Sequence, residues 1–369
     1  MTKLRLFAVI LAEFVMRGHD KKNGGVIPLR AAALPQDALG RPVRDLRISV
    51  MDRCNFRCPY CMPEDQYHPR FRFLDRSERL GFEEIGRLTR FFAQLGAHKL
   101  RITGGEPLLR SGVSDLIADI SQIDGVTDIA MTTNGILLAS HAAKLAAAGL
   151  GRVTISLDAL DESVFRQMTG GRGGVARVLD GIDAAIEAGL TPIKINTVVE
   201  RGVNEQSVTE LVEHFRGTGV IVRFIEYMDV GNINHWQRRD IVPSAELLQQ
   251  ISARWPMTAI TANYHGEVVS RYRFDDGAGE IGFISSVTAP FCRACTRARL
   301  SSDGKMYTCL FASQGLDLRG PLRNGASDEE LLDLVRSTWI RRDDRYSELR
   351  AKQHGEGHAK KVEMYYIGG

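Results

Sequence analysis

The feature that most constrains the fold is a regular alternation of short β-branched runs and segments with helical periodicity. The candidate strands lie, in order, at residues 46–50, 99–103, 128–133, 152–158, 192–199 and 220–228. The candidate helices between them lie at residues 82–96, 113–123, 141–150, 176–190 and 207–217. The first of these helices has one apolar face, made of Phe82, Ile85, Leu88, Phe92 and Leu95. Parallel strands need such crossover helices, so six β–α units predict an α/β fold with a parallel sheet, either a barrel or an open sheet.

Several candidate strands place polar side chains on one face. These polar positions are Arg101 and Thr103, Thr154 and Ser156, and Lys194 and Asn196, each pair separated by one apolar residue. A parallel sheet is normally buried on both faces, and burying an unpartnered Lys or Arg is costly. An exposed polar face would fit an antiparallel sheet better. We therefore expect a barrel-like curve whose polar lumen holds a polar or anionic ligand.

The pattern changes after residue 240, where a short helix at 244–251 leads into alternating segments and a second helix. We predict a β/α region at 41–240 and a smaller C-terminal α+β region at 241–345. A tail at 346–369 ends in two glycines, and residues 1–40 form an N-terminal extension.

The charge balance excludes some classes of partner. Among 369 residues, 48 Lys and Arg face 45 Asp and Glu, without the concentrated basic excess of a dedicated nucleic-acid binder. No apolar run reaches the roughly 20 residues that a membrane-spanning helix needs. Residues 6–16 resemble the start of a secretory signal, but Glu13 interrupts them and no small-residue cleavage site follows promptly. We expect a cytoplasmic protein with no membrane or nucleic-acid partner.

The six cysteines fall into two triplets. Cys54, Cys58 and Cys61 have the spacing C-x3-C-x2-C, and Cys292, Cys295 and Cys309 have the spacing C-x2-C-x13-C. A secreted disulfide scaffold would be smaller and more evenly crosslinked, so two metal sites in a reducing compartment fit better. A [4Fe–4S] cluster usually takes four thiolates, so each triplet would leave one iron open to another ligand. The alternatives are zinc sites, completed by His68 in the first triplet and by His265 in the second.

Two motifs together resemble the radical S-adenosylmethionine (SAM) superfamily. They are RISVMDRCNFRCPYC at 47–61, with Tyr60 in the aromatic position of the cysteine loop, and TGGEP at 103–107. The resemblance implies an incomplete parallel β/α barrel of about six βα units. It also implies a cluster on the first triplet whose open iron binds SAM, and reductive cleavage of SAM to a 5′-deoxyadenosyl radical. The SAM contacts implied by motif are Tyr60, Gly105, Ser156 and Met228.

The second triplet, the basic pair that follows it and the terminal Gly-Gly resemble one branch of that superfamily. This branch cyclises GTP in the first step of molybdenum cofactor biosynthesis, by removing the 3′ hydrogen and joining C3′ to C8 of guanine. The similarity runs from about Gly40 to Gly369. It implies a second [4Fe–4S] cluster whose open iron meets the guanine edge. The implied GTP contacts are Arg47, Lys99, Arg101, Thr132, Lys194, Arg297 and Arg299, and the implied catalytic residues are Cys54, Cys58, Cys61, Arg297 and Arg299.

By strand position, Arg223 is a further candidate for the GTP site, and Asp158 and Glu226 are candidates for charge placement. The resemblance also implies a reductant protein, and a cyclic pyranopterin phosphate synthase that acts on the product. Both a monomer and a homodimer stay open. Two other functions compete with this one. One is a radical SAM peptide-modifying enzyme with an auxiliary cluster, which usually has more C-terminal cysteines. The other is a zinc-stabilised binding module without catalysis.

Overall fold

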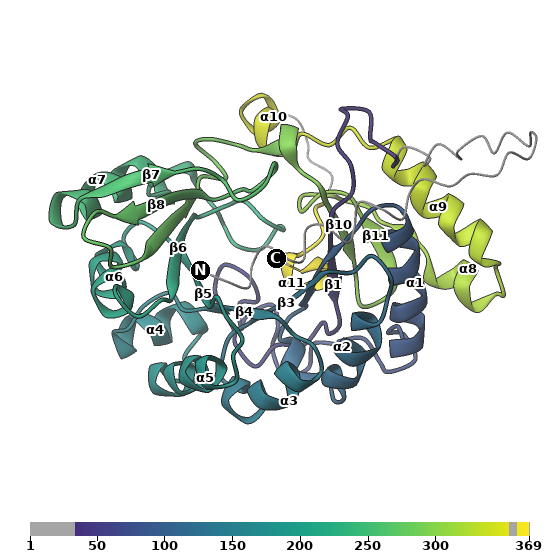
Figure 1. The fold of residues 1–369 in the computed structure, drawn as a ribbon, viewed down its shortest axis with the longest axis horizontal. Coiled ribbons are helices and arrows are strands. Elements are labelled where there is room, and N and C mark those ends of the chain that lie inside the picture. The colour runs from purple at the N-terminus through teal and green to yellow at the C-terminus, as the bar shows by residue number, and fades with distance from the viewer. Residues whose placement is uncertain (1–33, 354–359, 369) are drawn as a thin grey trace, which may run out of the picture. The chain divides into compact units, whose positions relative to one another are not determined.

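A computed structural model describes residues 34–353 and 360–368, and its strands form one 12-stranded sheet (Figure 1). The strands are β1 (Asp45–Ser49), β2 (Lys99–Thr103), β3 (Asp128–Thr133), β4 (Arg152–Ser156), β5 (Lys194–Val199), β6 (Ile221–Glu226), β7 (Met257–Ile260), β8 (Ser270–Phe274), β9 (Glu280–Ile284), β10 (Arg297–Leu300), β11 (Lys305–Tyr307) and β12 (Leu316–Asp317). The α-helices are α1 (Phe82–Gln94), α2 (Val113–Ser121), α3 (Ala142–Ala147), α4 (Glu162–Thr169), α5 (Val175–Glu187), α6 (Val208–Phe215), α7 (Ser244–Arg254), α8 (Arg319–Arg323), α9 (Asp328–Ile340), α10 (Tyr346–Gln353) and α11 (Met364–Ile367). Short 3₁₀ turns lie at η1 (Pro107–Leu109), η2 (Leu138–Ser140), η3 (Glu205–Ser207), η4 (Arg238–Asp240) and η5 (Cys292–Ala294).

The strand order is β12-β11-β10-β1-β2-β3-β4-β5-β6-β9-β8-β7. The run from β10 to β9 is parallel, and the two strands beyond it at each edge are antiparallel. The edge strands β12 and β7 do not pair with each other, so the sheet is not closed. The predicted incomplete parallel β/α barrel with a C-terminal α+β region is confirmed. The sequence did not predict that β9 and β10 extend the parallel part on both sides.

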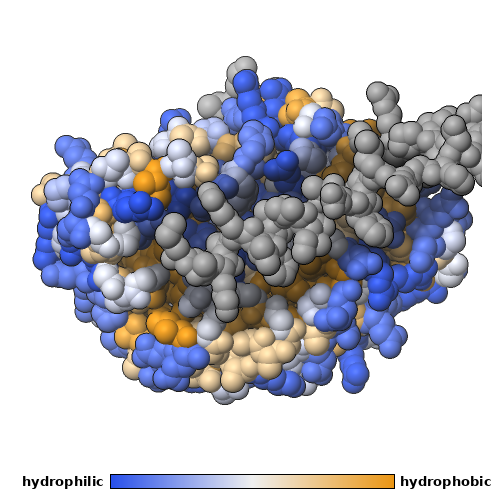
Figure 2. Space-filling view, in the orientation of Figure 1, coloured by the Kyte–Doolittle hydropathy of each residue, from blue (hydrophilic) through white to orange (hydrophobic). Residues whose placement is uncertain are grey.

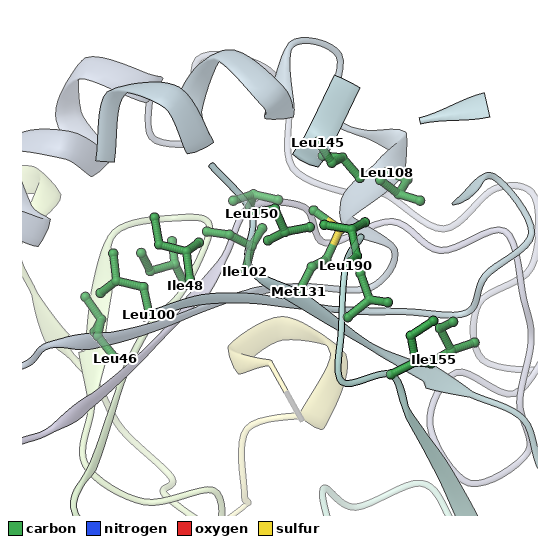
Figure 3. Packing of buried hydrophobic residues seen from close by; sticks show 14 of the residues in the cluster. Leu46, Ile48, Leu100, Ile102, Leu108, Met131, Leu145, Leu150, Ile155 and Leu190 are labelled. Atoms are coloured by element: carbon green, nitrogen blue, oxygen red, sulfur yellow. The ribbon is translucent and has the colours of Figure 1, made fainter. Parts of the chain in front are cut away.

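The apolar side of the strands packs under the helices. Leu46, Ile48, Leu100, Ile102 and Met131 are completely buried on this side of the sheet, in one layer with side chains of the covering helices (Figure 3). Much of the outer surface is polar, although weakly hydrophobic residues lie along the lower margin in Figure 2. In Figure 2, hydrophilic residues cover the margins where α6, α7 and α8 lie in Figure 1, and hydrophobic residues show nearer the middle. The other side of the sheet is therefore left for the polar side chains.

The expected strands agree with the structure to within two residues at each end. The strand predicted at 192–199 begins at Lys194, because Pro192 has no amide hydrogen to donate to a neighbouring strand. Residues 1–33, which include the apolar segment 6–16, lie outside the described residues. Within the described part of the chain, no helix is long and apolar enough to cross a membrane. The domain boundaries at residues 240 and 345 stay predictions.

The buried layer predicts a strong dependence of stability on single side chains. Leu100→Ala removes a completely buried side chain, and we expect it to lower the free energy of unfolding by about 2–5 kcal/mol. Leu109→Ala is the matched control, because this leucine is 38% exposed and should cost much less. Urea unfolding followed by circular dichroism measures both, and equal losses would contradict the assignment of Leu100 to the core.

Candidate functional site

All six cysteines line one cavity in the lumen of the sheet. The first triplet follows the carboxyl end of β1, the edge at which sites of parallel α/β folds are usually built, whereas Cys292 and Cys295 precede the amino end of the parallel strand β10. The strands contribute polar and basic side chains to the same cavity: Arg47, Arg101, Thr132, Ser156, Asn196, Arg223, Arg297 and Arg299. The polar lumen expected from the strand pattern is therefore present, with a cysteine triplet at each of two places on its wall.

The first triplet lies on the loop between β1 and α1. The amides of Cys61 and Met62 donate to the carbonyl of Cys58, at 3.0 and 2.8 Å, which closes a tight turn. The guanidinium of Arg57 donates to three carbonyls of this region: those of Cys54, Phe56 and Tyr67. These bonds hold the three thiols toward one cavity.

The chemistry of these thiols fits a bound iron–sulfur cluster. Burial raises the pKa of Cys54 to about 12, and the carboxylate of Glu106 adds to the shift. Burial and then the neighbouring thiols Cys54 and Cys61 raise the pKa of Cys58 well above its usual value. Thiolates are the ligand form, so ionisation here needs positive charge of the kind that iron supplies. The three free thiols thus form a donor set one ligand short of a cubane.

The zinc alternatives require a single ion held by several side chains. Among the residues that the structure describes, no three His, Cys, Asp or Glu side chains form a group that could hold one metal ion. His68 and His265 therefore complete no such group with the cysteines. A four-iron cluster is wider than one ion and binds thiolates that stand farther apart.

The turn after β2 packs directly against the first cysteine loop. A Cβ atom on Gly104, whose φ is +148°, would stand 2.4 Å from the carbonyl oxygen of Met51. A Cβ on Gly105 would stand 2.4 Å from the carbonyl oxygen of Arg53. Both glycines are required because the two backbones approach this closely.

Glu106 holds this corner together from inside. Its carboxylate is completely buried and accepts hydrogen bonds from the amides of Leu108 (3.0 Å) and Asn134 (2.8 Å) and from the hydroxyl of Thr133 (2.8 Å). Burial raises the pKa of Glu106 to about 7, against the effect of these three donors. The side chain therefore fixes η1 to the end of β3, and it is the glycines before it that line the cavity.

The four residues expected at the SAM site, Tyr60, Gly105, Ser156 and Met228, all line the cavity. The Tyr60 hydroxyl donates to Asp158 Oδ2 at 2.9 Å, and Asp158 Oδ1 accepts from the amide of Val198 at 2.9 Å. Burial raises the pKa of Asp158 to about 7, although both hydrogen bonds favour the charged form.

Asp158 lines the cavity and fastens the first cysteine loop to β5. Glu226 is outside the residues that line the cavity. Its carboxylate accepts hydrogen bonds from Ser244, Val287 and Thr288, which joins the end of β6 to α7 and to the loop after β9.

Three arginines lie in register across neighbouring strands. Arg47 of β1 pairs with Arg101 of β2 on one side and with Arg299 of β10 on the other. Burial and the neighbouring Arg297 and Arg101 lower the pKa of Arg47 to about 9. Burial, then Arg223 and other cations, lowers the pKa of Arg101 to about 10. This crowding of buried positive charge is unfavourable by itself and favours an anion in the cavity.

Neutral oxygen atoms hold these arginines in place. Arg101 Nη1 donates to the hydroxyls of Thr132 (3.0 Å) and Thr154 (3.2 Å). Arg223 Nη2 donates to the side-chain oxygen of Asn196 at 2.6 Å. Hydroxyl and amide oxygens orient a guanidinium without cancelling its charge. Arg223, a secondary expectation from strand position, therefore belongs to the same basic group.

The two lysines expected at the GTP site are not among the residues that line the cavity. The ammonium of Lys99 lies 3.9 Å from a carboxylate oxygen of both Asp45 and Asp128, and 4.0 Å from the ring centre of Tyr264. Lys194 has no such carboxylate partner among the described residues, and burial followed by the nearby Arg223 lowers its pKa to about 7. Lys194 thus belongs to the basic group, whereas carboxylates offset the charge of Lys99.

The second triplet meets the basic group directly. Arg297 Nη2 donates to Cys295 Sγ at 3.3 Å. Burial acts to raise the pKa of Cys295, but Arg297 and Arg342 outweigh it and lower this pKa to about 6. Burial raises the pKa of Cys309 to about 11. Three thiols on one cavity again form a donor set one ligand short of a cubane cluster.

Two features of the site escaped sequence reasoning. Arg342 donates to the carbonyl of Cys295 at 2.7 Å and pairs with Asp37 at 3.2 Å. Arg342 and Cys295 are 47 residues apart in the sequence, so no local sequence pattern could predict this contact. Helix α11 lies inside the curve of the sheet against β1, and Arg299 donates to the carbonyl of Gly368 (Figure 1). A glycine pair at a chain end carries no periodicity from which such a position could be predicted.

Comparison with known proteins gives consistent matches. The family model described as Radical SAM superfamily matches residues 48–215, and the model described as Molybdenum Cofactor Synthesis C matches residues 220–348. The chain is 54% identical over 334 residues to a GTP 3′,8-cyclase of Xanthomonas axonopodis pv. citri (strain 306), covering 90% of this chain and 98% of that protein. It is 49% identical over 358 residues to a GTP 3′,8-cyclase of Acidothermus cellulolyticus, covering 90% and 99%.

A solved structure shares the fold at low identity. Streptococcus suis SuiB bound to S-adenosylmethionine superposes with a TM-score of 0.55 at 16% identity, covering 80% of this chain and 68% of that one. SuiB bound to its precursor peptide SuiA gives a TM-score of 0.57, also at 16% identity, covering 84% and 66%. These likenesses concern the fold alone.

Glu106→Ala tests the internal role of this carboxylate. The change leaves two amides and a hydroxyl buried without their acceptor, at about 1–3 kcal/mol each. We expect the free energy of unfolding to fall by about 3 kcal/mol or more in urea titrations, and iron incorporation to fall with it. The control Glu83→Ala removes an exposed carboxylate and should change stability by less than about 0.5 kcal/mol. A Glu106→Ala protein as stable as this control would disprove the role.

Proposed function

Because the chain belongs to the radical SAM superfamily, and within it to the family of the GTP 3′,8-cyclases, we propose that its cavity binds SAM and GTP together. The reaction is the conversion of GTP to (8S)-3′,8-cyclo-7,8-dihydroguanosine 5′-triphosphate, the first step of molybdenum cofactor biosynthesis. The observation that carries the proposal is a buried group of cations with neutral hydrogen-bond acceptors, lying between two triplets of free cysteines in one cavity.

The first triplet and the residues around it form the proposed SAM side. Cys54, Cys58 and Cys61 would hold the first cluster, and when bound this cluster and SAM supply the radical that removes the 3′ hydrogen of GTP. Tyr60 is held by Asp158, so its ring stays in one orientation beside the cysteines. Gly105 leaves backbone exposed where a larger residue would collide with the cysteine loop.

The other two proposed SAM contacts, Ser156 and Met228, belong to the ends of two further strands. Ser156 ends β4 and Met228 follows the end of β6, and both line the same cavity as the first triplet. A hydroxyl and a thioether at these ends suit the polar and apolar parts of SAM. The four SAM contacts therefore come from four separate segments that only the fold brings together.

The basic group forms the proposed GTP side. Arg47, Arg101 and Arg299 present a row of guanidinium groups to the triphosphate, with Arg297 next to the second triplet. Guanidinium groups suit phosphate oxygens because their donors match two acceptors at once. Thr132 orients Arg101 through its hydroxyl. Lys194 adds buried positive charge close to Arg223 and Arg101, and Lys99 acts at longer range because carboxylates offset its charge.

Cys292, Cys295 and Cys309 would hold a second [4Fe–4S] cluster, and when bound this cluster would supply an iron for binding the guanine edge. Arg297 binds Cys295 and also lines the cavity, so it links the base end of GTP to the phosphate end. Its guanidinium lies 5.1 Å from the ring centre of Phe291, which limits its movement.

The activity requires partners that lie outside the chain. We infer a reductant protein that delivers single electrons, a cyclic pyranopterin phosphate synthase that consumes the product, and a cytoplasmic location. A monomer and a homodimer are both compatible with the site, because all its proposed residues come from one chain. High identity to GTP 3′,8-cyclases over nearly the whole chain supports GTP over a peptide as substrate.

One experiment tests the function. Reduced, cluster-reconstituted protein is incubated with SAM and GTP without oxygen, and nucleosides are analysed by mass spectrometry. We expect 5′-deoxyadenosine formation that depends on GTP, with a new cyclised nucleotide. Deoxyadenosine formed equally without GTP, with no new nucleotide, would refute the assignment. A colourless protein loaded with zinc would favour the non-catalytic binding module.

Arg101→Ala separates GTP binding from SAM cleavage. Loss of a charged donor should weaken GTP binding by about 1.5–3 kcal/mol, or about ten- to a hundredfold in Kd. SAM cleavage in the absence of GTP should stay unchanged, because Arg101 contacts Thr132 and Thr154 rather than the first cysteine loop. Arg336→Ala, at an exposed salt bridge on α9, is the control. Equal loss of both activities would argue against the role of Arg101.

The lowered pKa of Lys194 predicts proton uptake. With a pKa of about 7, Lys194 is mostly neutral at pH 8.5 in the free protein, and a bound triphosphate favours its charged form. Lys194 should then contribute the uptake of close to one proton on GTP binding at pH 8.5 and almost none at pH 6, where this side chain is already charged. Calorimetry in buffers of different ionisation enthalpy measures this number. Lys194→Met should abolish the uptake, the exposed Lys144→Met should not, and absence of uptake in the unmodified protein would contradict the assignment.

A further inference from the structure

The end of the chain reaches the cavity from a cluster of charged residues outside it. The loop after β6 contains Asp229 and Asn232, and the tail contains Lys361 and Glu363. We call these four residues, with Arg350 of α10, the clasp. Within the clasp, Asp229 directly follows Met228, which lines the cavity, and Glu363 directly precedes helix α11. Its contacts decide where the tail enters the lumen.

Asp229 is the centre of the clasp. Asp229 as a residue is only 7% exposed. Its carboxylate lies 2.8 Å from Arg350 Nε and 2.9 Å from Lys361 Nζ. The hydroxyl of Tyr346 donates to Asp229 Oδ2 at 2.5 Å, and Lys361 also donates to the backbone carbonyl of Asp229 at 2.7 Å. One carboxylate thus joins β6, α10 and the tail.

A second group of bonds fixes the backbone of the tail. Asn232 donates from its amide to Glu363 Oε1 at 3.0 Å and from its side chain to the same oxygen at 2.8 Å. Its side-chain oxygen accepts from the amide of Lys361 at 2.9 Å. A Cβ on Gly231 would stand 1.9 Å from Glu363 Oε2, so this position has no room for a side chain while Glu363 is seated.

The clasp also touches the segment that carries Cys309. The amide of Val362 donates to the carbonyl of Ala312 at 2.8 Å. Phe311 stacks on Tyr346 with ring centres 4.3 Å apart, and Lys361 Nζ lies 4.6 Å from the Tyr346 ring centre. The tail is therefore held at one place to both the β6 loop and the loop after the second cysteine triplet.

Beyond the clasp the tail is buried in the lumen. Tyr365 packs edge-on against Tyr67 with ring centres 5.0 Å apart, and Ile367 is completely buried. Arg299 then donates to the carbonyls of Ile367 and Gly368. The five residues from Glu363 to Ile367 thus connect the clasp to an arginine of the basic row.

From this geometry we propose that Asp229 is a positioning residue that seats the C-terminal tail in the lumen and, through the carbonyl of Gly368, orients Arg299. Asn232 acts with it by fixing the backbone of Lys361 and Glu363. Neither residue touches the reacting atoms. The effect on Arg299 rests on the proposed placement of GTP on this arginine, whereas the seating of the tail does not.

Hydrogen–deuterium exchange of the reconstituted holoenzyme tests the seating. Asp229→Asn keeps the shape but removes the charge that holds Arg350 and Lys361, and Asn232→Ala removes only contacts to the tail from an exposed position. We expect the amides of residues 362–367 to exchange at least tenfold faster in Asp229→Asn and at least threefold faster in Asn232→Ala. Peptides from β2 to β5 should exchange at the unmodified rate. Lys361→Arg keeps the charge and should stay within twofold of the unmodified protein.

Asp328→Asn is the matched control, because it removes a paired but 72% exposed carboxylate that lies 2.7 Å from Arg87. If Asp229→Asn does not fold, Asn232→Ala and Lys361→Gln carry the test alone. Exchange of residues 362–367 at the unmodified rate in the folded variants would overturn the seating role.

Kinetics test the second half of the proposal. An unseated tail should raise the KM for GTP at least tenfold and increase the ratio of 5′-deoxyadenosine to cyclised product. Iron content and SAM cleavage without GTP should stay unchanged. Faster exchange with an unmodified KM and ratio would overturn the orientation of Arg299 while the seating stands. If the unmodified protein itself makes no cyclised nucleotide, the proposed function fails, and the exchange result still decides whether the clasp holds the tail.

Discussion

The site depends on buried positive charge that is oriented but not neutralised. Arg101 is held by two threonine hydroxyls and Arg223 by an asparagine side chain, and Arg299 donates to backbone carbonyls. Neutral acceptors bind these donors without cancelling the charge, as a carboxylate would, and Arg223 Nε is buried without a hydrogen-bond partner among the described residues. Burying this charge is unfavourable. The buried apolar side of the same strands, which packs under the helices, supplies stabilising free energy that offsets this cost. One side of the sheet thus stabilises the fold, and the other side carries the charge of the lumen.

The same field affects the two cysteine triplets differently. Cys54 and Cys58 lie away from the arginine row, where burial raises the pKa of both thiols. Cys295 lies against Arg297, and its pKa falls to about 6 in spite of burial. The protein therefore supplies the counter-charge for one thiolate of the second triplet, whereas the first triplet relies on metal for it. Position in the chain explains the difference, because Cys295 stands two residues before Arg297 at the start of β10, whereas the first triplet follows the far end of β1.

Sequence periodicity was enough to predict the first six strands, because each strand of a parallel sheet has its own apolar repeat. It also predicted that Arg101 and Lys194 face the lumen. The pattern could not show that Lys99, on the same face as Arg101, lies between two carboxylates, since Asp45 and Asp128 become its neighbours only through strand pairing. The places of β9 and β10 beside the first six strands also depend on long-range pairing. Resemblance to a family supplied the contacts that local pattern cannot encode.

The C-terminal tail also contacts the buried arginines through neutral oxygen atoms and keeps its charged side-chain contacts elsewhere. Its charged contacts, at Asp229 and Glu363, lie outside the lumen, and in the described part of the tail it is backbone carbonyls that reach the arginine row. A Cβ on Gly368, whose φ is +75°, would stand 2.2 Å from the methyl carbon of Thr103. Small size is therefore required at the point where the tail meets Arg299.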